Sequence, residues 1–312
     1  MKTYTCKNIR NIALAGHGGS GKTSVAEGLL YKCGEIERMG KVSDGNSVCD
    51  YDPEEIKRKI SLGTSLAYCQ WKDVKINILD TPGQFDFAAG FYEGISAAES
   101  VVIALPAKDG VQVGTIKAYR EAVKHGKATM FVVTRMEEEN SNFYKCLEEL
   151  KTQFGPSICP IVVPFDKYGT VESYINLLEM KAYTYDNGVP TEVPMPASEN
   201  RLKGLRAAMA EAVADEELMM RYFENEGEDF TEAEIVKGLH DGIHKGYITP
   251  VVCCSGDTLA GIDMMLNTII YMLPSPDETD GELCDDGSKV QYASRDTLEA
   301  KVFKTVADPF VG

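Results

Sequence analysis

The sequence lacks the features by which exported, membrane-spanning and thiolate-metal proteins are recognised. Its nine cysteines include no CxxC pair, and its four histidines form no cluster at metal-ligand spacing, so we expect reduced thiols. The first eleven residues contain no apolar stretch of the kind that a secretory signal needs. The longest apolar runs, 101–105 and 129–133, are far shorter than the roughly 20 residues of a membrane helix. These absences predict a cytoplasmic protein without a membrane partner.

Positive charge is also scarce. Lysine and arginine total 32 against 48 acidic residues, which gives a net charge of −16. This balance argues against a diffuse basic surface for sequence-independent binding to DNA, so any contact with RNA must be local. The 312 residues, 44% of them hydrophobic, can bury one large core or two smaller ones. We take a folded monomer as the starting expectation.

The first half of the chain alternates short β-rich runs with longer helical stretches. The expected strands are 9–14, 64–71, 75–80, 101–105 and 128–133, and the expected helices are 23–32, 88–98, 114–125 and 142–154. This alternation predicts an α/β fold with a mostly parallel sheet covered by helices on both faces. Prolines then interrupt strand-like pieces from position 157, and helices are expected near 199–214 and 231–246. The first rhythm returns with a strand at 249–254 and a helix at 262–272, so the middle region reads as a separate α+β unit.

A glycine-rich loop joins the first expected strand to the first expected helix. It reads GHGGSGKT and satisfies GxxxxGK[ST], the phosphate loop of the P-loop NTPases. In such a loop backbone N–H groups surround phosphate oxygens, Lys22 bridges the β- and γ-phosphates, and the Thr23 hydroxyl reaches Mg²⁺. The predicted nucleotide-binding residues here are Gly16, His17, Gly18, Gly19, Ser20, Gly21, Lys22, Thr23 and Ser24. The alternative is a glycine-rich turn without a ligand.

The tetrapeptide DTPG at 80–83 ends the strand expected at 75–80. Asp80 can reach the Mg²⁺ shell from this strand end, while the Gly83 N–H faces the γ-phosphate. The next residue, Gln84, carries an amide that can donate and accept at once, so it can orient an attacking water. We therefore predict Gln84 and Lys22 as catalytic residues. A plain turn and an exposed glutamine are the alternatives.

A further metal ligand is expected just before the strand at 64–71. A mobile loop there could bring the Ser61 hydroxyl to the ion, although a serine in this position often has no such role. The predicted metal ligands are therefore Thr23, Ser61 and Asp80.

The position after the fifth strand normally carries NKxD, which reads guanine, but here it reads TRME at 134–137. Thr134 and Arg135 replace Asn and Lys, and Glu137 supplies a longer carboxylate, so we expect a weaker preference for guanine. After the strand at 249–254, the backbone of Ser255 and Gly256 could form a second base loop, or only an ordinary strand end.

The spacing of these two loops predicts an inserted domain. Glu137 and Ser255 lie 118 positions apart, where about 30 would suffice for one helix and one strand. We assign 1–157 and 248–276 to the nucleotide domain and 158–247 to the insertion. An acidic linker is expected at 277–298, and 299–312 would begin a second, β-barrel domain that the chain does not complete.

Several stretches together resemble translation elongation factor G over the whole chain: its nucleotide domain, its inserted subdomain and the opening of its second domain. They are Ala15–Thr23, Asp50–Ser65, Asp80–Phe87, Gly110–Gly114, Asn140–Phe143, YMLPSP at 271–276 and KVFKTVADPFVG at 301–312. The resemblance implies a GTPase that binds GTP or GDP with Mg²⁺ and couples hydrolysis to translocation on the ribosome. It also implies large-subunit RNA, the sarcin–ricin loop, near the nucleotide.

The chain departs from that family at four places. The family's histidine after DTPG is Gln84, its phosphate-loop aspartate is Gly19, its switch threonine is Ser61, and its NKMD is TRME. Gln84 keeps hydrolysis chemically possible, whereas Gly19 and TRME point to altered nucleotide use in a divergent paralogue. The alternatives are a ribosome-binding paralogue with a degenerate site and little or no hydrolysis, a ribosome-protection factor, and a metabolic ATPase or kinase.

Overall fold

A seven-stranded sheet forms the centre of the protein. The computed structural model describes residues 2–167, 169–196, 199–213, 230–283, 287, 289–290 and 300–306. The sheet has the order β2-β3-β1-β4-β5-β11-β6. Its strands are β1 Ile9–Gly16, β2 Ser65–Trp71, β3 Val74–Asp80, β4 Ser100–Pro106, β5 Ala128–Thr134, β6 Ile158–Pro160 and β11 Thr249–Cys253. Only β2 pairs antiparallel, with β3, and this confirms the mostly parallel α/β fold.

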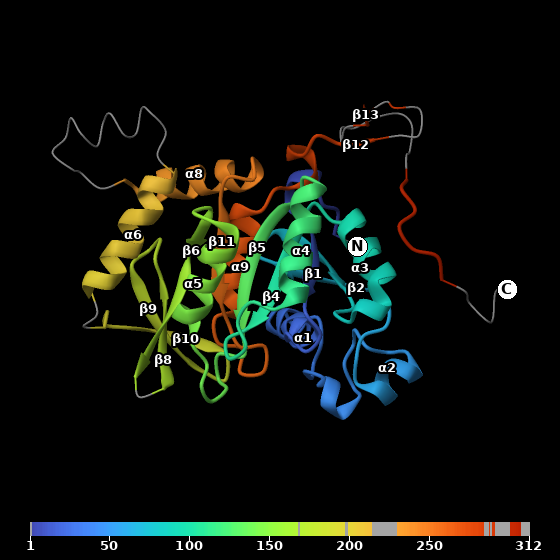
Figure 1. The fold of residues 1–312 in the computed structure, drawn as a ribbon, viewed down its shortest axis with the longest axis horizontal. Helices are drawn as coiled ribbons and strands as arrows, with labels where there is room; N and C mark the ends of the chain where they lie inside the picture. Colours follow the sequence, from blue (N-terminus) through green and yellow to red (C-terminus); the bar gives the residue numbers. More distant parts are fainter. Residues whose placement is uncertain are drawn as a thin grey trace.

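Helices cover both faces of this sheet, as the continuous apolar strands predicted. Every residue of β4 and β5 is buried, because parallel strands at the centre of a sheet have helices on both sides. The covering helices are α1 Lys22–Lys32, α3 Ala88–Ala97, α4 Val113–Lys124, α5 Phe143–Phe154 and α9 Ile262–Met272. In Figure 1, α4 and α5 lie in front of the sheet and α9 behind it, and α1 packs against α9.

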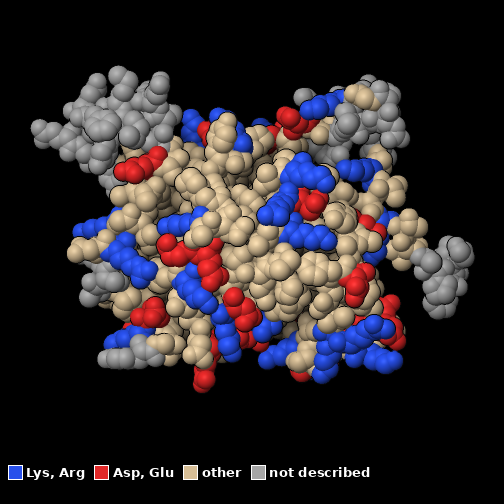
Figure 2. All heavy atoms as spheres, in the orientation of Figure 1, with Lys and Arg blue, Asp and Glu red and all other residues tan. Residues whose placement is uncertain are grey.

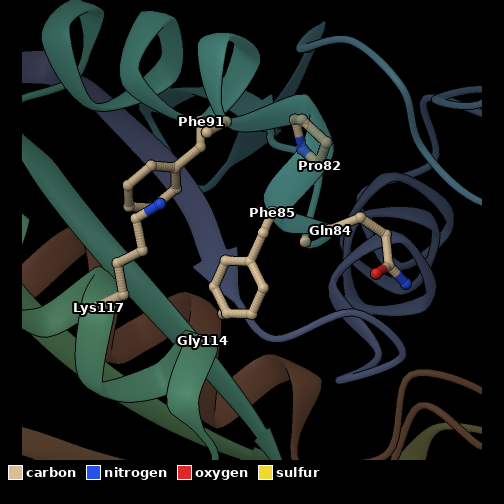
Figure 3. A pocket seen from close by; sticks show the side chains of 9 residues that line it. Pro82, Gln84, Phe85, Phe91, Gly114 and Lys117 are labelled. Carbon is tan, nitrogen blue, oxygen red and sulfur yellow. The ribbon is translucent and has the colours of Figure 1, made fainter.

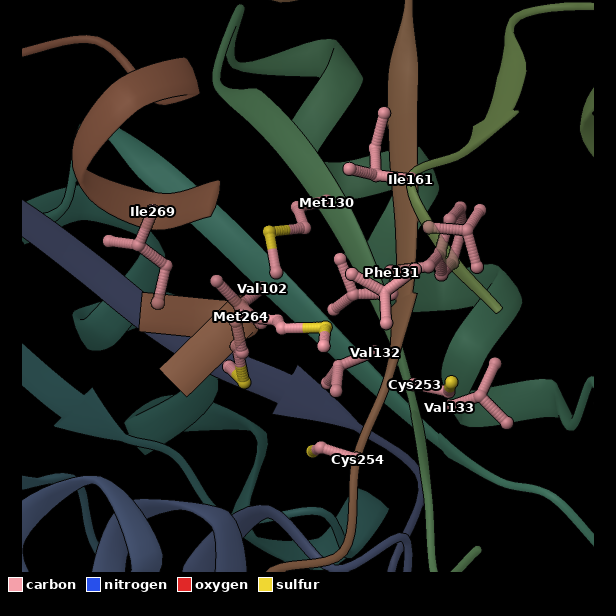
Figure 4. Close-up of a cluster of buried hydrophobic side chains, with 14 of the residues drawn as sticks. Val102, Met130, Phe131, Val132, Val133, Ile161, Cys253, Cys254, Met264 and Ile269 are labelled. Carbon is pink, nitrogen blue, oxygen red and sulfur yellow. The ribbon is translucent and has the colours of Figure 1, made fainter. Parts of the chain in front are cut away.

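Aromatic and sulfur-containing side chains fill the core. Tyr119 of α4 stacks on Phe131 of β5 with ring centroids 5.6 Å apart, and Phe154 of α5 lies 5.3 Å from the same ring. Figure 4 shows more of this core, where Cys253 of β11 lies beside Val133 of β5 and Met264 of α9 lies near Val102 of β4. Helix α9 also packs against β11.

A second sheet is antiparallel and has the order β10-β9-β8-β7. Its strands are β7 Val162–Lys167, β8 Thr170–Asn176, β9 Lys181–Asp186 and β10 Val189–Val193, followed by α6 Glu199–Val213 and α8 Glu232–His244. Thr231 caps α8 by accepting from the Glu234 N–H, as the sequence signal predicted. The chain passes from the main sheet into this sheet between Pro160 and Val162. Residues 158–160, at the start of the proposed insertion, therefore lie in the main sheet, because β6 pairs with β11.

One helix was not expected. Residues Pro53–Arg58 form α2, which begins at an Asp52 cap and has proline in its first position. In the described part of the C-terminal region, Phe303 packs against a small cluster formed by Ala13, Leu79 and Ala98. Lys304 Nζ donates to the Thr64 carbonyl at 2.5 Å. Most of the proposed linker after 283, and the end of the proposed second domain from 307 onward, lie outside the described residues.

No helix in the described ranges is long and apolar enough to span a membrane.

Candidate nucleotide site

The phosphate-loop residues form a tight turn between β1 and α1. Gly19 and Gly21 have φ values of 79° and 85°, a region that side-chain-bearing residues rarely adopt. The Ser20 N–H donates to the His17 carbonyl at 3.2 Å and closes the turn. Gly114, at the start of α4, supports the loop from outside, since a Cβ there would lie 2.6 Å from His17 Cα. The first turn of α1 thus presents its free N–H groups beside the loop.

Lys22 is held inside this loop. The residue is 5% exposed, and its Nζ donates to the carbonyls of His17 at 2.9 Å and Gly16 at 3.4 Å. Burial lowers the pKa of Lys22 to about 8, against the opposing effect of Asp80 and Asp50. A buried ammonium that has only carbonyl hydrogen bonds would be stabilised by an anion. The loop is therefore prepared for a phosphate.

The three predicted metal ligands come together. Thr23 Oγ1 donates to Asp80 Oδ2 at 2.7 Å and lies 3.3 Å from Ser61 Oγ. The second oxygen of Asp80 is buried and has no hydrogen-bond partner, and burial raises the pKa of this carboxyl to about 7. An orphaned carboxylate oxygen beside two hydroxyls suits a hard cation such as Mg²⁺. The described chain contains no group of three or more His, Cys, Asp or Glu that could hold a metal. Mg²⁺ is commonly bound through one or two carboxylates together with phosphate oxygens and water, which fits the single Asp80 carboxylate here.

Ser61 is placed by a buried carboxylate in α2. Glu55 Oε1 accepts from the N–H groups of Leu62 at 2.8 Å and Gly63 at 3.2 Å, directly after Ser61. Its other oxygen accepts from the Asp52 N–H at 3.2 Å and completes a capping box. The serine therefore depends on α2 for its position.

A second buried carboxylate holds the segment before α2. Glu27 of α1 is 1% exposed and accepts from the Gly40 N–H at 2.9 Å, the Ser47 hydroxyl at 2.8 Å and the Val48 N–H at 2.5 Å. Asp50, two residues later, is buried, and burial raises its pKa although the Ser61 hydroxyl opposes this shift. The site therefore contains two buried carboxyl groups, Asp50 and Asp80, and one buried amino group, that of Lys22.

The DTPG segment lies directly against the phosphate loop. A Cβ at Gly83 would come 2.4 Å from Lys22 Nζ and 2.8 Å from the Gly18 nitrogen, so only glycine fits there. Figure 3 shows Gln84 and Phe85 directed to opposite sides of this segment. Phe85 lines a shallow, solvent-open pocket together with Pro82, Phe91, Lys117 and others. Gln84 also lines this pocket, and its amide reaches Gly18, where a Cβ would meet its Nε2 at 2.5 Å.

The TRME segment is joined to the phosphate loop through its first residue. The buried Thr134 hydroxyl lies 2.7 Å from the Ser20 carbonyl and 3.2 Å from the Leu105 carbonyl. Arg135 pairs with Glu138 at 2.8 Å, while Glu137 is exposed. Burial raises the pKa of Cys254 and the charge of Glu137 raises it further, so Glu137 lies close to the second predicted base loop. The arginine is engaged by a neighbouring acid.

The second predicted base loop packs on the start of α1. The Ser255 N–H donates to the Ala260 carbonyl at 2.9 Å, and its hydroxyl accepts from the Thr258 N–H at 2.9 Å. A Cβ at Gly256 would lie 2.7 Å from the Ser24 carbonyl oxygen. The loops after β1, β3, β5 and β11 thus meet at one edge of the sheet, as the carboxyl ends of parallel strands do in α/β proteins.

Comparison with known proteins agrees with this arrangement. The family model described as elongation factor Tu GTP binding domain matches residues 7–275, which is most of the chain. The chain belongs to this family. An elongation factor G-like protein of Thermotoga maritima is 35% identical to it over 98% of this chain and 44% of the relative. A solved structure from Thermus thermophilus is 36% identical, with a TM-score of 0.82, over 87% of this chain and 41% of that one. The chain spans less than half the length of either relative.

Two residues of this GTP-binding domain that sequence reasoning missed are Glu27 and Glu55. Glu55 could have been found, because Asp52 and Glu55 have capping-box spacing around a proline. Glu27 gives no such signal, since a glutamate in a helix usually faces water. Its partners become visible only when the 40–48 segment is seen folded over α1.

Proposed function

We propose that this chain is the nucleotide-switch portion of an elongation factor G-like translation factor. It binds GTP or GDP with Mg²⁺ and hydrolyses GTP in step with translocation when the full-length protein is on the ribosome. The observation that carries the proposal is the meeting of Thr23, Ser61 and Asp80 beside the buried Lys22. These residues come from three separate segments, and each has the chemistry that its role in a GTP switch requires.

The residues fit the ligands that this function needs. Lys22 would bind phosphate oxygens, and Thr23, Ser61 and Asp80 would hold the ion, with Asp80 acting directly or through water. When bound, Mg²⁺ would neutralise negative charge on the phosphates. The ion would give the unbonded Asp80 oxygen a partner. The phosphates would stabilise the charged form of Lys22, whose pKa is lowered by burial.

Gln84 is the residue that would orient the attacking water. Its amide lies against Gly18 of the phosphate loop, and an amide can donate one hydrogen bond while it accepts another. The Gln84 amide can donate and accept these hydrogen bonds without losing or gaining a proton. Hydrolysis at this site would therefore depend on where Gln84 is placed.

The partner in this proposal is the ribosome, with large-subunit RNA near the nucleotide, and the protein acts as a cytoplasmic monomer. Basic and acidic side chains are interspersed on the face drawn in Figure 2, with basic groups near α2. Lys57 and Arg58 of α2 keep 77% and 57% of their side chains exposed, although both contact Glu54. They provide a local basic group beside Ser61, which supports an RNA contact at this place.

The second candidate is a ribosome-binding paralogue, or a ribosome-protection factor, whose nucleotide site is degenerate. The pairing of Arg135 with Glu138 favours it, since the residue in the position of the family's lysine is then engaged by an acid and not by a base. The two candidates differ in turnover, because the second needs little or no hydrolysis.

The deciding experiment titrates the full-length protein with fluorescent GDP, GTP and ADP in the presence of Mg²⁺. We expect guanine nucleotides to bind more tightly than ADP, Lys22→Ala to abolish binding, and ribosomes to stimulate turnover. Guanine binding without turnover on ribosomes would support the degenerate paralogue. Tighter binding of ADP than of GDP would overturn the GTPase proposal in favour of a metabolic ATPase or kinase.

A further inference from the structure

The inserted sheet touches the second base loop, which we define as residues 254–261. Tyr185 of β9 donates its hydroxyl hydrogen to Asp263 Oδ1 at 2.7 Å, and Asp263 lies in the first turn of α9 directly after the loop. Burial, together with the charge of Asp263, raises the pKa of Tyr185, so its hydroxyl stays protonated at neutral pH and donates. The hydrogen bond therefore connects the inserted unit to the end of the base loop.

A second contact lies beside the first. Tyr174 of β8 is buried and meets Tyr185 edge to face, with ring centroids 5.5 Å apart. At Gly261, the last residue of the base loop, a Cβ would lie 3.3 Å from Tyr174 Cδ1 and 2.6 Å from the Cys253 carbonyl. Gly261 also has a φ of 76°, which favours glycine. At Gly261 the loop thus passes between Tyr174 and the end of β11, and there is no room for a side chain at this position.

The turn between β9 and β10 makes the third contact. Gly188 has a φ of 77°, and a Cβ there would lie 2.7 Å from Cβ of Leu259 in the base loop. Its carbonyl accepts from Lys32 Nζ, at the end of α1, at 2.6 Å. Leu259 itself is buried although its φ is 63°, a conformation that leucine rarely adopts. The surrounding contacts hold the loop in this conformation.

The other side of the base loop rests on α1. Gly256 lies against Ser24, and a Cβ at Gly28 would come 3.1 Å from the Gly256 carbonyl. The loop is therefore fixed between the helix that follows the phosphate loop and the sheet of the inserted unit. Loosening either support would let its backbone leave the conformation in which it can hold a base.

We propose that Tyr185 is a positioning residue for nucleotide recognition, and that the inserted unit sets the affinity for the guanine base through it. This inference rests on the proposed function, because it assigns the 254–261 loop to the base. A loop held in its bound conformation spends less conformational entropy on binding, so the hydrogen bond to Asp263 slows nucleotide release. We expect its loss to speed GDP release about five- to tenfold.

The experiment compares four single variants, and the double variant that combines Tyr185→Phe with Asp263→Ala, with the natural sequence in the full-length protein. Tyr185→Phe removes only the donating hydroxyl, Asp263→Ala removes the acceptor, and Asp263→Asn keeps an accepting oxygen. Tyr183→Phe is the matched control, because Tyr183 lies on the same strand but its hydroxyl bonds Glu179 within the inserted unit at 3.0 Å. Release of fluorescent GDP is followed by stopped flow, and affinities for GDP and for inosine diphosphate give the base discrimination.

Tyr185→Phe and Asp263→Ala should speed release and reduce discrimination between the two bases, and the double variant should be no faster than either. Asp263→Asn should recover most of the slow release that Asp263→Ala loses, and Tyr183→Phe should match the natural protein. Release from Tyr185→Phe at the natural rate overturns this inference alone. Equal acceleration by Tyr183→Phe does so too, because general loosening of the sheet would then be the cause. Absence of guanine binding in the natural protein overturns the proposed function as well.

Discussion

Gln84 and Gly18 touch across the gap between the DTPG segment and the phosphate loop. A Cβ built at Gly18 would lie 2.5 Å from Gln84 Nε2 and 2.9 Å from its Cδ atom. The missing side chain at Gly18 therefore determines where the amide of Gln84 can lie. Nε2 and Cδ both belong to the Gln84 amide, so this amide would have to move aside if residue 18 carried a side chain.

Gly18→Ala should slow GTP hydrolysis without preventing nucleotide binding. The added methyl group displaces Gln84, and displacement of a catalytic group by about 1 Å can lower a rate on the order of 100-fold. Single-turnover hydrolysis and GDP affinity measure the two effects separately. The double variant with Gln84→Ala should be no slower than Gln84→Ala alone. A natural hydrolysis rate in Gly18→Ala would show that Gln84 does not act from this position.

Glu55→Ala should weaken the use of Mg²⁺. Without the carboxylate, the N–H groups of Leu62 and Gly63 lose their acceptor, and Ser61 is no longer held near Thr23. We expect the Mg²⁺ concentration for half-maximal hydrolysis to rise about tenfold. Glu55→Gln keeps the oxygen that accepts from both groups and should remain close to the natural protein. Equal behaviour of the two variants would contradict this role of Glu55.

Nucleotide binding above pH 8 should take up a proton at Lys22. Burial holds the pKa of the free Lys22 at about 8, so the side chain is mostly neutral at pH 9. Bound phosphates raise this pKa, so affinity should fall about tenfold for each pH unit above 8. Calorimetry with GDP and EDTA in two buffers of different ionisation enthalpy counts the protons. Lys22→Arg stays charged and should take up none, and an identical count in both proteins would refute the assignment.

Thr134→Val should loosen the connection between β5 and the phosphate loop. Valine has the shape of threonine but cannot donate to the Ser20 carbonyl, so we expect a loss of about 1 kcal/mol in unfolding free energy. Chemical denaturation measures this change, and GDP titration should show a parallel loss of affinity. Thr134→Ser retains the hydroxyl and serves as the control. A Thr134→Val protein with unchanged stability and affinity would assign Thr134 to packing alone.

The phosphate loop could be predicted from the sequence because all of its chemistry lies in eight successive residues. The GHGGSGKT run stands between an apolar strand and a helix, and these local preferences agree with the final structure. The same holds for the mostly parallel sheet, since buried strands such as 128–134 read as continuous apolar runs. The choice of Thr23, Ser61 and Asp80 as partners followed from residue chemistry and from the resemblance to a known family.

Only the tertiary structure decided how those parts are supported. Glu27 is buried because Gly40, Ser47 and Val48 fold back over α1, and such partners cannot be read from a helical pattern. Tyr185 of the inserted sheet bonds Asp263, directly after the base loop, across a sequence separation of 78 residues. Exposure of Glu137 likewise depends on which way the chain leaves β5. Local motifs follow from neighbouring residues, whereas burial and support depend on surfaces that meet only when the whole chain has folded.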